Sequence, residues 1–84
     1  MSQVTVYTRP FCIWCFRAKR LLRKLGIGFE ERDARSLETR AILLARTGRN
    51  TVPQVFFGEV PVGGFEDLRR LAERGELPSL APSA

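Results

Sequence analysis

The chain has 84 residues and a formal net charge of +5, from 14 Lys and Arg against 9 Asp and Glu. This length suits one small domain, and 44% hydrophobic with 27% charged residues is typical of a globular protein, not of a disordered or low-complexity chain. No apolar run approaches the ~18 residues that a membrane-spanning helix needs, and no signal sequence is visible. The chain has no histidine, which excludes Cys–His and Ser–His catalysis and histidine-ligated metals.

The first half of the chain predicts a strand, a helix and a second strand. Residues 3–7 alternate with Val4 and Val6 on one face, which indicates a strand. Residues 12–25 follow helical spacing, and a glycine then ends the helix. Residues 27–31 alternate again, and their charges place this strand near a sheet edge. The expected apolar stripe of the helix is Phe11, Cys15, Ala18, Leu22 and Leu25.

The second half predicts a helix, a hairpin and a final helix. Ser36 is a good N-cap for a helix that Gly48 stops. Residues 52–57 form a strand that a Gly58-Glu59 turn connects to a short strand over 60–62. A helix over about 65–74 follows, and residues 77–84 are expected to be a loosely docked tail. The expected apolar faces are Leu37, Ala41, Leu44 and Ala45 in the former helix and Leu68, Leu71 and Ala72 in the latter.

The predicted order is therefore β-α-β-α-β-β-α within one domain over residues 1–84. The first βαβ unit is expected to be parallel and right-handed, and the last two strands form a hairpin. Together these units predict an α/β fold with a four-stranded mixed sheet and helices on both faces.

A pair of cysteines carries the clearest chemical signal. Cys12-Ile13-Trp14-Cys15 follows a strand and opens a helix, a context that favours a redox-active pair over a structural one. Unpaired backbone N–H groups and the helix dipole favour a thiolate at Cys12, and Arg9 and Lys19 act in the same direction. A thiolate is the attacking species in disulfide exchange.

Helical geometry distinguishes the two sulfur atoms. Cys15 shares the apolar stripe, whereas Cys12 points in a wetter and more basic direction. Cys12 is therefore predicted to be the exposed nucleophile and Cys15 the shielded resolving thiol. Two alternatives stay open: a pair of buried structural cysteines, and half of a zinc or iron–sulfur site completed by a second chain or a small thiol.

Three further positions have two interpretations each. The Val52-Pro53 bond is either a plain strand start or a cis bond that presents the Val52 backbone beside the cysteines. Gly63-Gly64 is either a simple tight turn or part of an anion site at a helix N-terminus. Trp14 is either a core residue or an exposed platform, and its place between the cysteines favours partial exposure.

With these residues considered together, the chain resembles the small bacterial glutaredoxins over about Val4 to Leu77. Four features match the family's order and spacing: Cys12-Ile13-Trp14-Cys15, Thr51-Val52-Pro53-Gln54, Gly63-Gly64 with Asp67-Leu68, and Arg9 before the active loop. The cysteine motif alone is moderately specific, and the combination is highly specific.

The resemblance implies a thioredoxin fold and a cytoplasmic, monomeric, glutathione-dependent thiol–disulfide oxidoreductase. Its expected partners are glutathione and proteins that carry disulfides or glutathione mixed disulfides. The scattered basic residues argue against nucleic acid, and the absence of a long apolar run argues against a membrane. It implies a cis Pro53. The implied glutathione site has Thr51 and Val52 at the cysteinyl part, Gly64, Phe65, Glu66 and Asp67 at the γ-glutamyl end, Arg9 and Arg40 at the glycine carboxylate, and Trp14 where the family usually has tyrosine.

One departure from the family pattern opens alternatives. Ile13 stands where dithiol glutaredoxins commonly have proline, which affects the redox potential and the preferred reductant. One alternative is a redoxin reduced by a thioredoxin reductase. The other is a dimeric carrier in which Cys12 helps to hold a bridging iron–sulfur cluster. Glu66 also brings a negative charge near the γ-glutamyl carboxylate, which weakens that contact.

Overall fold

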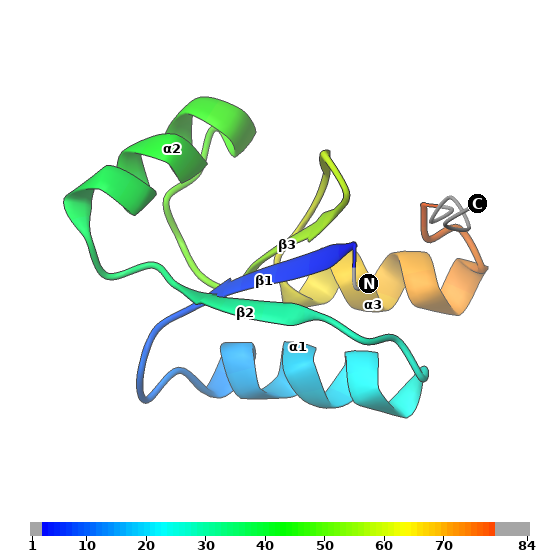
Figure 1. Cartoon of the computed structure of the whole chain (residues 1–84). Coiled ribbons are helices and arrows are strands. Elements are labelled where there is room, and N and C mark those ends of the chain that lie inside the picture. Colours follow the sequence, from blue (N-terminus) through cyan, green and yellow to red (C-terminus); the bar gives the residue numbers. More distant parts are fainter. Residues whose placement is uncertain (1–2, 79–84) are drawn as a thin grey trace.

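The structure is a computed structural model that describes residues 3–78, and its elements follow the predicted order. The elements are β1 (Val4–Thr8), α1 (Ile13–Lys24), β2 (Glu30–Asp33), α2 (Leu37–Thr47), β3 (Gln54–Phe57), β4 (Val60–Gly63) and α3 (Phe65–Arg74). The sheet has the order β2-β1-β3-β4, with β1 and β2 parallel and the other two pairs antiparallel (Figure 1). The predicted four-stranded mixed sheet is therefore confirmed.

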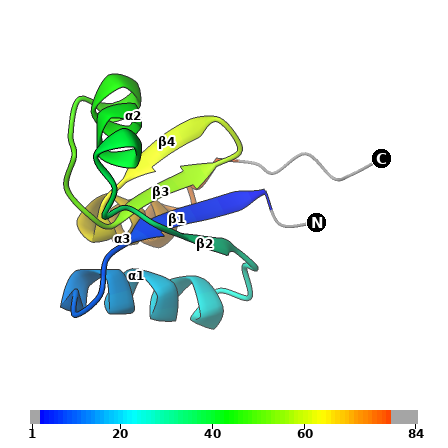
Figure 2. The ribbon, with the colours of Figure 1, turned by 60° about the vertical axis from the view of Figure 1, so that its left-hand side comes forward.

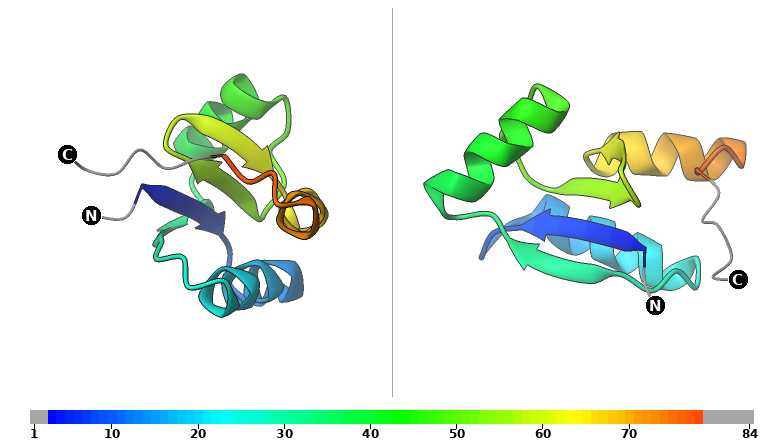
Figure 3. Two further views of the ribbon diagram at one scale, coloured as in Figure 1. Left: turned by 90° about the vertical axis from the view of Figure 1, so that its right-hand side faces the viewer. Right: turned by 45° about the horizontal axis from the view of Figure 1, so that its top comes forward.

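Helices cover both faces of this sheet, as predicted (Figures 2 and 3). The larger core cluster joins the sheet to α1 and α3, whereas a smaller one lies under α2. Because α2 buries only Leu43, most of the apolar burial is on the side of α1. The larger cluster consists of Val4, Val6, Ala18, Leu22, Val55, Phe57 and Leu68, and the smaller one of Ala34, Leu43 and Phe56.

Local signals at the helix ends are confirmed. Ser36 caps α2, since its Oγ accepts a hydrogen bond from the Thr39 N–H at 3.1 Å. Gly48 and Gly75 end α2 and α3 with φ values of 76° and 67°, a left-handed conformation that favours glycine. These signals depend on a few neighbouring residues, so the sequence predicts them well.

The predicted inner face of α2 is wrong. Leu37 and Leu44 are 79% and 51% exposed, and the side chain that reaches the core is Leu43. The half-buried residues on the inner face are mostly polar, among them Thr39, Arg40 and Thr47. Most of the apolar side chains of α2 therefore lie on the face that is not packed against the sheet.

The predicted stripe of α1 is correct in its middle and wrong at its ends. Cys15, Ala18 and Leu22 are buried. Phe11 is fully exposed because it precedes the helix and has φ 59°, so helical spacing does not apply to it. Leu25 is the C-cap and is 43% exposed.

The strand near the sheet edge begins later than predicted. β2 starts at Glu30 and is an edge strand, as its charges indicated. Ile27 and Phe29 lie before it but still pack against the larger core cluster, as does Leu77. Residues 79–84 of the predicted tail lie outside the described residues. Between residues 3 and 78, no helix is long and apolar enough to cross a membrane.

Candidate active site

Both cysteines lie at the N-terminus of α1. Cys12 is the N-cap residue, and its Sγ accepts a hydrogen bond from the Cys15 N–H at 3.1 Å. The carbonyl of Cys12 accepts the first bond of the helix from the Phe16 N–H, also at 3.1 Å. A donor aimed at the sulfur, together with the helix dipole, stabilises negative charge on Cys12 Sγ. Both cysteines are free thiols.

Cys12 is more exposed than Cys15, as predicted. Cys15 is 2% exposed, whereas Cys12 is half-buried and accessible. Burial, followed by the hydrogen bond with Cys12, raises the pKa of the Cys15 thiol to about 12, although the Arg9 backbone and the Lys19 charge act against this. Cys15 is therefore a protonated thiol at neutral pH, and Cys12 is the sulfur that a substrate can reach.

The raised pKa of Cys15 gives a prediction for stability. The thiol has a pKa of 9.0 in the absence of these effects, so between about pH 9 and 12 the folded state binds more protons than the unfolded state. The free energy of unfolding of the reduced protein is therefore expected to fall with rising pH, by up to about 1.4 kcal/mol per pH unit from this group. Chemical denaturation at several pH values measures this slope. Cys15→Ala should remove this part of it, and equal slopes in the two proteins would contradict the assignment.

A cleft of about 570 Å³ opens beside the cysteine pair, toward β2. Glu31 of β2 accepts hydrogen bonds from Thr8 Oγ1 at 2.7 Å and from Lys19 Nζ at 2.9 Å. The Thr8 bond and then Lys19 hold the pKa of Glu31 below its usual value. Arg9 and Lys19 line this cleft together with Cys12, and Lys19 shares its charge with Glu31. The effect of these two charges on Cys12 stays a prediction.

Trp14 connects the cysteine loop to α3. It is 46% exposed, so the predicted partial exposure is confirmed, and its ring centroid lies 5.8 Å from that of Phe65. The Arg17 guanidinium lies 4.8 Å from the Trp14 ring on the next turn of α1. The Val52–Pro53 peptide bond is cis, as the family resemblance implies.

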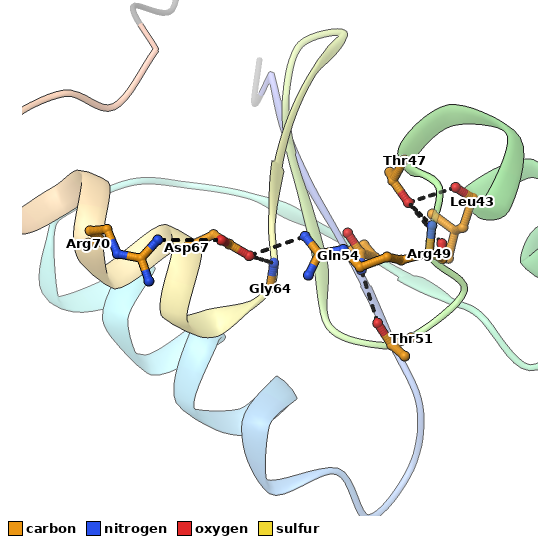
Figure 4. A network of polar contacts seen from close by, with 8 residues as sticks. All are labelled: Leu43, Thr47, Arg49, Thr51, Gln54, Gly64, Asp67 and Arg70. Carbon is orange, nitrogen blue, oxygen red and sulfur yellow. Dashed lines mark hydrogen bonds and ion pairs between the residues drawn. The ribbon is translucent and has the colours of Figure 1, made fainter.

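Asp67 is the centre of a polar network in the first turn of α3 (Figure 4). Its Oδ2 accepts hydrogen bonds from the Gly64 N–H at 2.9 Å and from Arg49 Nη2 at 3.2 Å. Partial burial acts to raise the pKa of Asp67, but the Gly64 bond and the Arg49 charge hold it below its usual value. Oδ1 lies 4.0 Å from the Arg70 guanidinium. Asp67 is therefore a charged carboxylate at neutral pH.

The loop before β3 carries a second part of this network. Gln54 Nε2 donates a hydrogen bond to Thr51 Oγ1 at 3.3 Å, which orients the exposed Thr51 hydroxyl beside the cis bond (Figure 4). Gln54 is buried, and its Oε1 has no hydrogen-bond partner among residues 3–78. Pro53 is buried and Val52 is half-buried.

Of the remaining predicted site residues, Gly64 and Glu66 lie at the start of α3, whereas Arg9 lies in the cleft beside Cys12 and Arg40 on α2. Gly64 is the N-cap of α3, and Glu66 pairs with Arg69 at 2.6 Å along that helix. Arg9 is exposed beside Cys12, whereas Arg40 is half-buried on α2. In the part of the chain that the structure describes, no ion pair involves Arg9 or Arg40, so both guanidinium groups are available to an anion.

Sequence reasoning missed Arg49 and Glu31. Arg49 lies in the loop between α2 and β3, 18 residues before its partner Asp67, and no periodic pattern marks it. Its position just before Thr51-Val52-Pro53 was the only available signal. Glu31 was recognised as an edge-strand charge, but its contact with Lys19 depends on the packing of α1 against the sheet.

The family model for glutaredoxin matches residues 4–62. The chain belongs to the glutaredoxin family. Membership identifies it as a thiol–disulfide oxidoreductase, and the paired Cys12 and Cys15 fit a dithiol redox role. The thioredoxin fold expected from the resemblance is thereby confirmed.

Similar proteins cover nearly the whole chain. A glutaredoxin of Neisseria meningitidis serogroup A is 48% identical over 82 residues, which is 95% of this chain and 96% of that protein. The solution structure of glutaredoxin from Brucella melitensis has 49% identity and a TM-score of 0.78, and covers 90% of this chain and 84% of that one. A crystal structure of a buckwheat glutaredoxin–glutathione complex has 29% identity and a TM-score of 0.81, and covers 89% of this chain and 72% of that one.

Proposed function

We propose that this protein uses glutathione to reduce protein disulfides and glutathione mixed disulfides through Cys12 and Cys15. The observation that carries the proposal is the accessible Cys12, stabilised at a helix N-terminus and placed beside the buried, protonated Cys15. The buckwheat relative, solved as a complex with glutathione, supports glutathione as the reductant. The proposed site of action is the cytoplasm, where a glutathione pool keeps thiols reduced.

The proposed reaction begins at Cys12. Its thiolate attacks one sulfur of a substrate disulfide, forms a mixed disulfide and releases the other substrate sulfur, which takes up a proton. Cys15 then gives up its proton and attacks Cys12 Sγ, which forms the Cys12–Cys15 disulfide and releases the second substrate thiol. The high pKa of Cys15 keeps this thiol protonated until that step.

Two glutathione molecules complete the proposed cycle. The first attacks Cys12 Sγ as a thiolate, so that Cys15 leaves and regains its proton. The second attacks the glutathione sulfur of the mixed disulfide, which regenerates the Cys12 thiolate and yields oxidised glutathione. For a glutathione mixed disulfide, Cys12 and one further glutathione are sufficient.

We place glutathione along the loop before β3 and the start of α3. Thr51, Val52 and Pro53 offer backbone and hydroxyl groups to its cysteinyl part, and Gly64 to Asp67 receive its γ-glutamyl end. Trp14 and Phe65 supply adjacent aromatic surface. The unpaired guanidinium groups of Arg9 and Arg40 are suited to the glycine carboxylate. Because Asp67 already pairs with Arg49, the glutathione ammonium would share this carboxylate with it.

Removing the charge of Asp67 tests the γ-glutamyl end. Asp67→Asn keeps an oxygen that can accept the Gly64 N–H, so the helix cap is retained while the negative charge is lost. We expect the KM for glutathione to rise about two- to five-fold with little change in kcat, the size expected for one partly exposed ion pair. Glu73→Gln, an exposed acid on the same helix, is the matched control. If both variants have the wild-type KM, glutathione does not bind at this end of α3.

The choice of reductant separates the proposal from its closest alternative. Assays with NADPH offer either glutathione and glutathione reductase or a thioredoxin reductase as electron source. Efficient turnover only with the thioredoxin reductase would replace the proposal with the alternative redoxin. We further propose a monomer, which size-exclusion chromatography tests.

The residues described do not by themselves fit an iron–sulfur cluster. Between residues 3 and 78, no group of three or more His, Cys, Asp or Glu side chains is arranged to hold a metal, and Cys15 is buried. The cluster-bridged dimer would therefore need ligands from outside the chain. Visible absorbance after anaerobic purification tests this alternative.

A further inference from the structure

A groove of about 780 Å³ lies between α1 and α3, the two helices that share one face of the sheet. Leu21 and Phe65 line it with apolar surface, and both pack against the core cluster below. The other lining residues are five cations and one acid, Arg17, Arg20, Arg23, Lys24, Arg69 and Glu73. The groove is therefore an apolar channel with a strongly basic rim.

The four groove cations of α1, unlike Lys19 on the same helix, form no ion pair with a described acidic residue. Among residues 3–78, eight ion pairs form, yet none involves the four groove cations of α1. Only Arg69, across the groove on α3, is paired, with Glu66 and Glu73. Arg17 and Arg23 instead lie over the rings of Trp14 and Phe29.

The spacing of these cations along α1 destabilises the helix. Arg20 has like charges at both i+3 and i+4, Arg23 and Lys24, and at i−3, Arg17. Such pairs are mutually repulsive on a helix surface. Arg23 and Lys24 benefit from the dipole in the last turn, whereas Arg17 and Arg20 do not. An anionic partner in the groove would relieve this repulsion.

One end of the groove, at Arg17 and Phe65, lies next to the cysteine loop, although neither cysteine lines it. Arg17 contacts Trp14, which lies between the two cysteines, and Phe65 contacts the same ring. From Cys12 to Lys24 the helix extends about 18 Å, at ~1.5 Å per residue. A segment of about five or six residues in extended conformation spans this distance, at ~3.3 Å per residue.

We propose that this groove binds an acidic segment of the disulfide-bearing protein substrate and presents the disulfide to Cys12. Guanidinium groups bind carboxylates through paired hydrogen bonds, and the apolar lining accommodates the aliphatic parts and neighbouring side chains of a peptide. The binding of an acidic segment is argued from the groove itself, whereas the statement that the partner carries a disulfide rests on the proposed function.

A binding experiment tests the groove without any turnover. The probes are two fluorescent peptides with serine in place of cysteine, one with five Glu or Asp residues and one with Gln and Asn at the same positions. In low salt, we expect the acidic peptide to bind at least about ten-fold more tightly than the neutral one, with a difference that shrinks as salt rises.

Matched variants locate the binding site. Arg20→Gln/Lys24→Gln removes two groove charges, and we expect it to lose most of the preference for the acidic peptide. Arg35→Gln/Arg46→Gln removes the same amount of charge on the opposite face of the sheet, since Arg35 lies just before α2 and Arg46 lies within it. We expect this variant to retain the preference for the acidic peptide. Equal losses in both variants would show an effect of net charge alone and overturn the proposal.

Turnover then distinguishes the groove from the proposed function. We expect kcat/KM for an acidic disulfide peptide to fall about five-fold in the groove variant, while a small glutathione mixed disulfide is reduced as by the wild type. Equal rates for acidic and neutral peptides in the wild type would overturn the groove proposal alone. Absence of glutathione-dependent turnover would refute the proposed function, and the binding experiment would still decide the groove.

A competitor of a different class completes the test. A fluorescent single-stranded oligonucleotide of about ten nucleotides is measured against the same variants. If it binds more tightly than the acidic peptide and loses this binding in Arg20→Gln/Lys24→Gln, the groove is a nucleic-acid site and the proposal is wrong.

Discussion

Replacing Cys12 by serine is expected to lower the reduction of every disulfide substrate by on the order of 10³-fold or more, because the attacking thiolate is lost. Cys12 is the accessible sulfur at the N-terminus of α1, and the Cys15 N–H donates directly to it. Cys15 cannot take its place, since it is 2% exposed and its pKa is about 12. The loss is measured with both a protein disulfide and a glutathione mixed disulfide.

The matched variant Cys15→Ser should behave differently with the two substrates. Release of a protein from its mixed disulfide with Cys12 uses Cys15, so reduction of protein disulfides should be lost. Reduction of a glutathione mixed disulfide should largely persist, because a second glutathione can resolve it. If Cys15→Ser is inactive in this second assay and Cys12→Ser is active, the roles of the two cysteines are reversed.

Gly63→Ala is expected to destabilise the protein by about 2–3 kcal/mol and to lower its Tm by about 10–20 °C. Gly63 has φ 113°, a conformation that disfavours any side chain. A Cβ there would lie 2.5 Å from Asp67 Oδ2 and 2.8 Å from Arg49 Nη2. The substitution therefore separates Asp67 from both the Gly64 N–H and Arg49 and should also weaken glutathione binding.

The neighbouring Gly64→Ala is the control for stability. Gly64 has φ −87°, and a Cβ there would lie 3.5 Å from the Pro53 carbonyl oxygen, an ordinary contact. We expect this change to cost less than about 1 kcal/mol. Thermal unfolding of the two variants measures the difference. Equal melting temperatures would show that the Asp67 network does not depend on close approach of the backbone at Gly63.

The amino-acid sequence by itself determined the features that depend on neighbouring residues. The order of strands and helices, the caps at Ser36 and Gly48, and the turn at Gly58-Glu59 all follow from local backbone preferences. The distinction between an accessible Cys12 and a buried Cys15 follows from helical spacing over one turn of α1. The motif residues also predicted a candidate site on the cysteine loop, on the cis-proline loop and at the start of α3, and the ligand contacts of these residues stay a prediction.

Only the tertiary structure decided how these parts meet. Which face of α2 packs against the sheet, with Leu43 buried and Leu37 and Leu44 exposed, is decided by the contact with the sheet. The positions of the leucines in the sequence of α2 do not predict it. The Arg49–Asp67 and Lys19–Glu31 pairs join residues 18 and 12 positions apart, and the groove joins α1 to α3. Strand pairing and helix packing bring such side chains together, and these long-range contacts leave no periodic pattern in the sequence of either partner.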